Sequence, residues 1–128
     1  MPRSRHGRHR VRRPIPVLRM FDVARTYEFY RDYLGFTVDW EHRFGAEFPL
    51  YAQVSRAEAT LHLSEHHGDG TPGSVVWIAV GDVFAWHAEL AAKNYRYAVP
   101  GPPEDGPGGP GFEPADPSGN VLRFAQPE

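Results

Sequence analysis

The chain has 128 residues, 41 % of them hydrophobic, and a formal net charge of −2. This length predicts a single domain with a hydrophobic core of its own. The absence of cysteine excludes a disulfide framework, a thiolate zinc site and a cysteine nucleophile. No apolar run is long enough to cross a membrane and the first residues lack a secretory signal, so we expect a cytoplasmic protein.

The charge is divided unevenly along the chain. Residues 1–13, MPRSRHGRHRVRR, hold six arginines and no acidic residue, which leaves 8 of the 14 basic residues against all 16 acidic ones in residues 14–128, a net charge of −8 there. Residues 1–13 lack apolar periodicity and are predicted to form a disordered basic arm ahead of a folded domain over 14–128. The arm suits nucleic acid or an anionic surface, or it is a dispensable extension. The acidic domain favours cationic ligands and disfavours nucleic acid.

The first half of the folded domain alternates strand and helix signals. Asp22 is a good helix N-cap and Gly35 a good C-terminal stop, with apolar residues at helical spacing between them. In ATLHLS, alternation turns Leu61 and Leu63 towards the helices and His62 to the opposite face. The predicted elements are a strand over 15–21, a helix over 23–34, and strands over 36–42, 47–54 and 59–64.

The same order of elements returns about 60 residues later. Asp82 takes the place of Asp22, between an apolar strand and an amphipathic helix. Residues 100–111, PGPPEDGPGGPG, are too rich in proline for a ladder strand, and DPSGN is a tight turn into the last strand. The predicted elements are a strand over 74–80, a helix over 83–94, and short strands over 95–99, 111–115 and 121–125. The sequence therefore predicts an α+β fold of two β-α-β-β-β modules.

Three motifs carry a resemblance to a known family: FDVARTYEFYRDYLGF after the first strand, IAVGDVFAWHAEL after the fifth, and DPSGNVLRF at the end. With these separations the chain resembles the glyoxalase / bleomycin-resistance / extradiol-dioxygenase superfamily, also called vicinal oxygen chelate, over about residues 14–126. The segments VDWEHRF, PLYAQVSR and LHLSEHHGDGTPGS resemble the bleomycin-resistance branch most closely. The resemblance implies paired modules that form a curved mixed sheet around a cleft, usually in a homodimer with two clefts.

In the metal-using members of that superfamily, the ligands stand at four cleft-facing positions on the first and last strands of each module. These positions fall here on Ile15, His62, Val75 and Arg123. Only His62 can bind a metal ion, whereas a catalytic metal needs about three protein ligands. We therefore expect no metal cofactor. The alternative is a divalent ion held by His62 with His66 and His67, although nothing in the sequence makes these three side chains converge.

Without a metal, the side chains that face the cleft would form a ligand site. Trp77 is the most informative, because Val76 and Ile78 can serve the core and leave its indole for a ligand, although it could merely fill a module interface. Arg19 and Arg123 each need a carboxylate partner or an anionic ligand group. Drug-binding members of the resembling branch usually carry a tryptophan before the seventh strand, where this chain has proline and glycine. The candidate ligand-binding residues are Arg19, Trp40, Phe48, Tyr51, His62, Trp77 and Arg123.

Two functions of different classes fit these observations. The first is a metal-independent binding protein, without catalytic residues, that sequesters a bleomycin-type glycopeptide antibiotic and so confers resistance. The motif likeness, the lost metal ligands and the acidic domain favour it. The alternative is a metal-dependent lyase, isomerase or dioxygenase that acts on a small molecule through His62.

Overall fold

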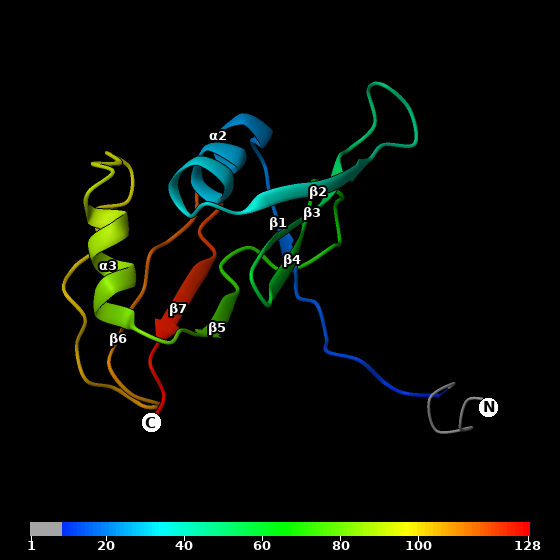
Figure 1. The fold of residues 1–128 in the computed structure, drawn as a ribbon. Coiled ribbons are helices and arrows are strands. Elements are labelled where there is room, and N and C mark those ends of the chain that lie inside the picture. The colour runs from blue at the N-terminus through cyan, green and yellow to red at the C-terminus, as the bar shows by residue number, and fades with distance from the viewer. Residues whose placement is uncertain (1–8) are drawn as a thin grey trace.

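The structure is a computed structural model, and it describes residues 9–128. These residues form a four-stranded sheet in the order β1-β4-β3-β2 and a three-stranded sheet in the order β5-β7-β6. In each sheet the first and last strands of a module pair in parallel, and the other pairs are antiparallel. The predicted α+β class is confirmed, and the order of elements repeats except for one strand of the second module. The elements are β1 (Val17–Arg19), α2 (Val23–Tyr27), η1 (Glu28–Tyr33), β2 (Thr37–His42), β3 (Tyr51–Arg56), β4 (Ala59–Ser64), β5 (Val75–Ala79), α3 (Val83–Ala91), β6 (Gly111–Phe112) and β7 (Val121–Ala125) (Figure 1).

The first helix begins as an α-helix and ends as a π-helix. Asp22 caps it as predicted, because its Oδ1 accepts from the backbone N–H of Arg25 at 3.0 Å. In the second half, the N–H of Leu34 donates to the carbonyl of Phe29, five residues back, at 2.9 Å. The wider turn directs several large side chains to the core. The buried residues of this helix and its C-cap are Thr26, Phe29, Tyr30, Tyr33 and Leu34.

The strand predicted over 95–99 does not form, so the second module has three strands where the first has four. Its tyrosines pack as individual side chains instead. Tyr95 stacks on Tyr33 of η1 with ring centroids 4.7 Å apart, and Tyr97 lies under the guanidinium of Arg25 at 3.7 Å. Asn94 turns the chain with a φ of 51° just before this segment. The alternating tyrosines of residues 95–99 therefore reflect packing against the first helix and do not mark a strand.

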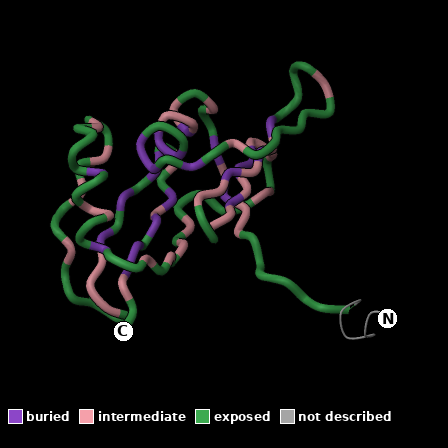
Figure 2. The backbone as a smooth tube through the Cα atoms, viewed as in Figure 1, coloured by how far each residue is buried: buried purple, intermediate pink, exposed green. Residues whose placement is uncertain are grey.

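One hydrophobic core joins both modules. Leu61 and Leu63 of β4, Leu90 of α3 and Phe124 of β7 are all buried in the same cluster. Buried positions alternate with half-buried ones along β1, β3 and β4, as expected for a sheet with one face on the core (Figure 2). Trp86 of α3 packs edge-on against Phe124 of β7, with ring centroids 5.4 Å apart.

The DPSGN turn ties the two sheets together. Tyr30 donates its hydroxyl proton to Asp116 Oδ2 at 2.7 Å, in a buried contact between the first helix and this turn. The side chain of Asn120 donates to the carbonyl of Arg19 at 2.9 Å and accepts from the N–H of Ser74 at 3.2 Å. Because Arg19 ends β1 and Ser74 precedes β5, one buried amide fixes how the sheets sit relative to each other.

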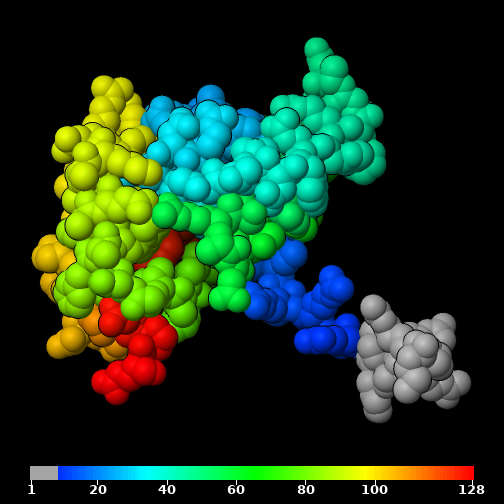
Figure 3. All heavy atoms as spheres, viewed as in Figure 1, coloured from blue at the N-terminus to red at the C-terminus, as the bar shows by residue number. Residues whose placement is uncertain are grey.

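Part of the predicted basic arm lies outside the described residues, which begin at residue 9. Residues 10–16 form no helix or strand, and Arg13 reaches Glu58 in an exposed ion pair at 3.0 Å. In Figure 3 this blue segment stands away from the body of the molecule. Across residues 9–128, no helix has the length and apolarity needed to cross a membrane.

Candidate ligand-binding site

The sheet β1-β4-β3-β2 turns one face to the core and the other outward. Leu61 and Leu63 of β4 are buried, and His62 between them is half-buried on the opposite side, as predicted. On β3, Tyr51 and Gln53 share the outward side with His62, since Ala52 and Val54 are buried. We call the outward side, with Arg19, Trp40, Tyr51, Gln53 and His62, the first face.

Trp40 reaches the first face through a β-bulge. Val38 pairs with Val54 and packs on the core, but the register then shifts, so that Trp40 pairs with Gln53. Strict alternation along β2 would place Val38 and Trp40 on the same side of the strand, and the register shift prevents this. The extra residue, Asp39, turns Trp40 away from the core. Its indole lies parallel to the ring of Tyr51 with centroids 6.0 Å apart.

A row of hydrogen bonds crosses the first face. Tyr51 Oη lies 2.6 Å from Nδ1 of His62, whose Nε2 lies 3.0 Å from Oε1 of Gln53. The amide nitrogen of Gln53 then donates to Asp39 at 3.1 Å. Burial lowers the pKa of His62 and raises that of Tyr51, and the nearby charge of Asp69 raises the latter further. Both groups are therefore neutral near pH 7.

Arg19 carries an uncompensated charge on the first face. No carboxylate of residues 9–128 lies within ion-pair distance of its guanidinium, and its Nε is buried without a hydrogen-bond partner among these residues. Its neighbour in space is the ring of Phe21, 4.8 Å from the guanidinium carbon. Of the two roles predicted for Arg19, a carboxylate partner is not found in the described chain, and binding of an anionic ligand group stays a prediction.

The outward side of sheet β5-β7-β6 holds Trp77. Val76 and Ile78 pack against the core, as predicted, and the indole between them is 45 % exposed. Arg123 is its partner on the neighbouring strand β7. A Cβ added at Gly108 would lie 3.1 Å from the indole, so the loop backbone rests on Trp77 and supports one of its sides. We call this side, with Val75, Trp77 and Arg123, the second face.

A hollow of about 760 Å³ opens beside Trp77, between the second face and the Pro/Gly-rich loop. Three carboxylates line it, those of Glu104, Asp105 and Glu113, against the single guanidinium of Arg123. Arg123 forms an ion pair with Glu113. The hollow is therefore acidic overall, with one indole wall, an arrangement that attracts planar cations. The sequence analysis did not single out the acidic residues of this loop as site residues, because the proline content of the segment predicted a loop without indicating what the loop contacts.

Phe48 stands apart from the residues with which it was grouped. The predicted strand over 47–54 begins only at Tyr51, and Phe48 lies in the β2–β3 loop, where its carbonyl accepts from Arg43 at 2.9 Å. The side chain is exposed and rests against Gly45. Its predicted role in ligand binding stays a prediction.

The loop after β4, SEHHGDG, is held by its own polar groups. Ser64 donates to Asp69 at 2.8 Å and accepts from the backbone of His66 at 3.0 Å. Glu65 accepts from the backbone of Leu50 at 2.8 Å. His67 points to solvent. The two acids and one hydroxyl of this segment thus stabilise the loop itself.

The residues at the four metal-ligand positions do not fit a metal ion. Ile15 and Val75 have no donor atom, Arg123 is a cation already paired with Glu113, and both ring nitrogens of His62 have hydrogen-bond partners. Within residues 9–128, no group of three or more histidine and acidic side chains is arranged to hold a metal ion.

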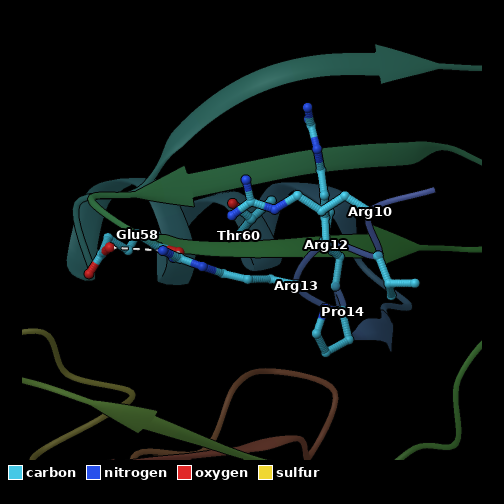
Figure 4. Close-up of a pocket in the computed structure, with 8 residues that line it drawn as sticks. Arg10, Arg12, Arg13, Pro14, Glu58 and Thr60 are labelled. Carbon is cyan, nitrogen blue, oxygen red and sulfur yellow. Dashed lines mark hydrogen bonds and ion pairs between the residues drawn. The ribbon is translucent and has the colours of Figure 1, made fainter. Parts of the chain in front are cut away.

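A second hollow, of about 880 Å³, lies between the basic arm and β4. Figure 4 shows Arg13 reaching Glu58, with Arg10 and Arg12 on the arm side and Thr60 on β4. The lining is largely exposed and carries three arginines against one acidic residue, Glu58. An exposed ion pair such as that of Arg13 with Glu58 contributes about 0–1 kcal/mol. Binding of nucleic acid by the arm stays a prediction.

Comparisons with known proteins define the class. The family described as glyoxalase superfamily protein matches residues 3–128. A bleomycin-binding protein from bleomycin-producing Streptomyces verticillus, solved in complex with copper(II)-bleomycin, is 30 % identical, with a TM-score of 0.72 over 93 % of this chain and 98 % of that one. An antibiotic binding protein from Streptomyces sp. CB03234 is 21 % identical, with a TM-score of 0.71 over 94 % and 100 %. A bleomycin resistance determinant encoded on transposon Tn5 is 22 % identical, with a TM-score of 0.72 over 92 % and 99 %. The curated proteins gave no match.

Two mixed sheets, each with one helix and a parallel pairing of the first and last strands of its module, define an α+β protein of the vicinal oxygen chelate type. The chain belongs to the glyoxalase superfamily. The resemblance seen in its three motifs is thereby confirmed at the level of family and fold.

Proposed function

We propose that this protein binds and sequesters a bleomycin-type glycopeptide antibiotic without a metal ion of its own, and so confers resistance. The observation that carries the proposal is the 30 % identity, over 93 % of the chain, with a protein solved in complex with copper(II)-bleomycin. Sequestration requires tight binding of one drug molecule per cleft and no turnover.

The chemistry of the second face supports this ligand class. The exposed indole of Trp77 offers a flat apolar surface, and Glu104 and Asp105 add negative charge beside it. A planar ligand that carries positive charge gains from both contacts. Relatives with a tryptophan in the Pro/Gly-rich loop would hold such a ligand from the loop side, whereas in this chain the indole comes from β5.

The proposal includes a homodimer with two clefts. Trp40 on the first face is 43 % exposed, and Val75 and Trp77 on the second face are exposed to a similar degree. Large apolar side chains exposed on two sheet faces of a small domain favour a partner surface that covers them in part. We expect the molecular mass in solution, measured by sedimentation, to be twice that of the 14.4 kDa chain.

Expression in a bleomycin-sensitive bacterium tests the function, with an Arg19→Ala, Trp77→Ala double variant as the matched control. The wild type is expected to raise the tolerated drug concentration in proportion to the amount of protein. The drug is then released by denaturing the protein, and its molecular mass is measured by mass spectrometry. An unchanged mass supports capture, whereas a changed mass indicates that the protein modifies the drug as an enzyme, as in the metal-dependent alternative. Equal survival of wild type and empty vector refutes resistance.

A further inference from the structure

One carboxylate decides in which direction the hydrogen bonds of the first face run. Asp39 accepts from Ser55 Oγ at 3.0 Å and from Gln53 Nε2 at 3.1 Å. Because an ionised carboxylate can only accept, the amide of Gln53 must turn its NH₂ group towards Asp39. Its carbonyl oxygen Oε1 then faces Nε2 of His62, 3.0 Å away, and can only accept there. Nε2 of His62 is therefore the nitrogen that carries the proton.

The same logic continues to Tyr51. A neutral imidazole with its proton on Nε2 has a bare lone pair on Nδ1. Tyr51 Oη lies 2.6 Å from this nitrogen, so the phenol donates its only proton inward to His62. The lone pairs of the Tyr51 oxygen remain, and at this point of the outward surface they can only accept.

We propose that Asp39 is a positioning residue that acts through Gln53 and His62 to make the oxygen of Tyr51 an obligatory hydrogen-bond acceptor, and that the first face thereby selects an N–H group of a cationic ligand. This inference rests on the proposed function, because it names the chemical group that the same ligand site selects. A carbonyl or carboxylate placed at Tyr51 would meet lone pairs and lose its hydrogen bonds to water.

The surroundings of Tyr51 favour a positively charged donor over a neutral one. The indole of Trp40 lies parallel to the phenol ring and offers its face to a cation. Asp39 lies one hydrogen bond beyond Gln53, and the charge of Asp69 acts on the Tyr51 oxygen. Arg19, the cation of this face, lies on β1, with β4 between it and Tyr51. An ammonium or amidinium group therefore fits at Tyr51, and an anionic group fits at Arg19.

Nuclear magnetic resonance of the ¹⁵N-labelled protein tests the first half directly, because long-range ¹H–¹⁵N correlations distinguish the two tautomers of a histidine. The signals of His62 are assigned with a His62→Gln variant. The wild type is expected to show the proton on Nε2. In Asp39→Asn, residue 39 can also donate, which frees Gln53 to flip, so a share of the Nδ1–H tautomer is expected. Glu41→Gln removes one charge from the same strand and should leave the tautomer unchanged. A wild type with its proton on Nδ1, or no change in Asp39→Asn, overturns the inference.

Two small cations test the second half. Benzylammonium and benzyltrimethylammonium carry the same charge and ring, but only the first has N–H groups. Titration followed by the amide signals of β3 and β4 is expected to show about tenfold tighter binding of benzylammonium to the wild type. Asp39→Asn should narrow that ratio, and Glu41→Gln should weaken both cations alike. Equal binding of the two cations, or binding of neither, overturns the selection.

The two proposals fail in distinguishable ways. If His62 has the expected tautomer and the N–H cation is preferred, but metal-free bleomycin does not bind, then the ligand identity is wrong and the first face stands as an N–H site. If bleomycin binds while His62 carries its proton on Nδ1, the proposed function survives and the role of Asp39 is refuted.

Discussion

Replacing Trp77 with alanine should weaken drug binding far more than it weakens the fold. The side chain is 45 % exposed, so a ligand could cover roughly 100 Å² of its surface. At about 25 cal/mol per Å² this contact stabilises the complex by at most about 2.5 kcal/mol, which corresponds to an affinity loss of up to about 70-fold in Trp77→Ala. The flanking Val76 and Ile78 keep the strand in the core, so we expect a loss of only about 1 kcal/mol in the free energy of unfolding.

The assay is a calorimetric titration with metal-free bleomycin, run on the wild type, on Trp77→Ala and on Trp86→Phe. Trp86 packs on Phe124 beneath α3, away from both faces, and its conservative variant controls for general loosening. Denaturant unfolding of each variant shows whether folding is intact. An unchanged affinity in a folded Trp77→Ala would remove Trp77 from the site and refute the argument from its exposed area.

Three further predictions concern the fold. Tyr30→Phe leaves the buried carboxylate of Asp116 short of one donor, so urea unfolding should show a loss of about 1–3 kcal/mol, and a loss below about 0.5 kcal/mol would contradict the role of this bond. Gly70→Ala places a Cβ 2.7 Å from the carbonyl of Val17 at a φ of +65°, which should lower the unfolding midpoint, whereas an unchanged midpoint would show that the loop can shift freely. Burial raises the pKa of Tyr33 to about 12, and burial with the charge of Asp116 raises that of Tyr30 well above its ordinary value. The unfolded chain then releases protons that the folded chain keeps, so the free energy of unfolding should fall as the pH rises above about 10. Stability that is flat through this range would contradict the burial of these phenols.

Local signals in the sequence were sufficient for most of the fold. The helix caps Asp22 and Asp82 and the alternation in ATLHLS and VLRFA follow from single-residue chemistry and a period of two, and the structure places β4 and β7 at the predicted bounds. The strand expected over 95–99 failed because Tyr95 and Tyr97 pack on partners about 60 or more residues away along the chain, and such partners cannot be identified from local pattern.

The candidate site was predicted only in part. Alternation was enough to predict that His62 and Trp77 face away from the core, because each lies between two core residues on a regular strand. Asp39 was missed, since its role depends on a β-bulge that reverses the facing of Trp40, and no residue type in VDWEHRF marks that bulge. Glu104 and Asp105 were missed for a related reason. Their position beside Trp77 depends on the path of a loop, and the local sequence pattern does not determine that path.

The most direct test of the central claim is the affinity of the chelator-treated protein for metal-free bleomycin, measured by calorimetry together with tryptophan fluorescence. We predict saturation at one drug molecule per cleft, with submicromolar affinity and quenching of the emission because an indole contacts the drug. No heat and no quenching at micromolar protein would contradict capture of this antibiotic. Binding that appears only after a divalent metal is restored to the protein would contradict its metal independence.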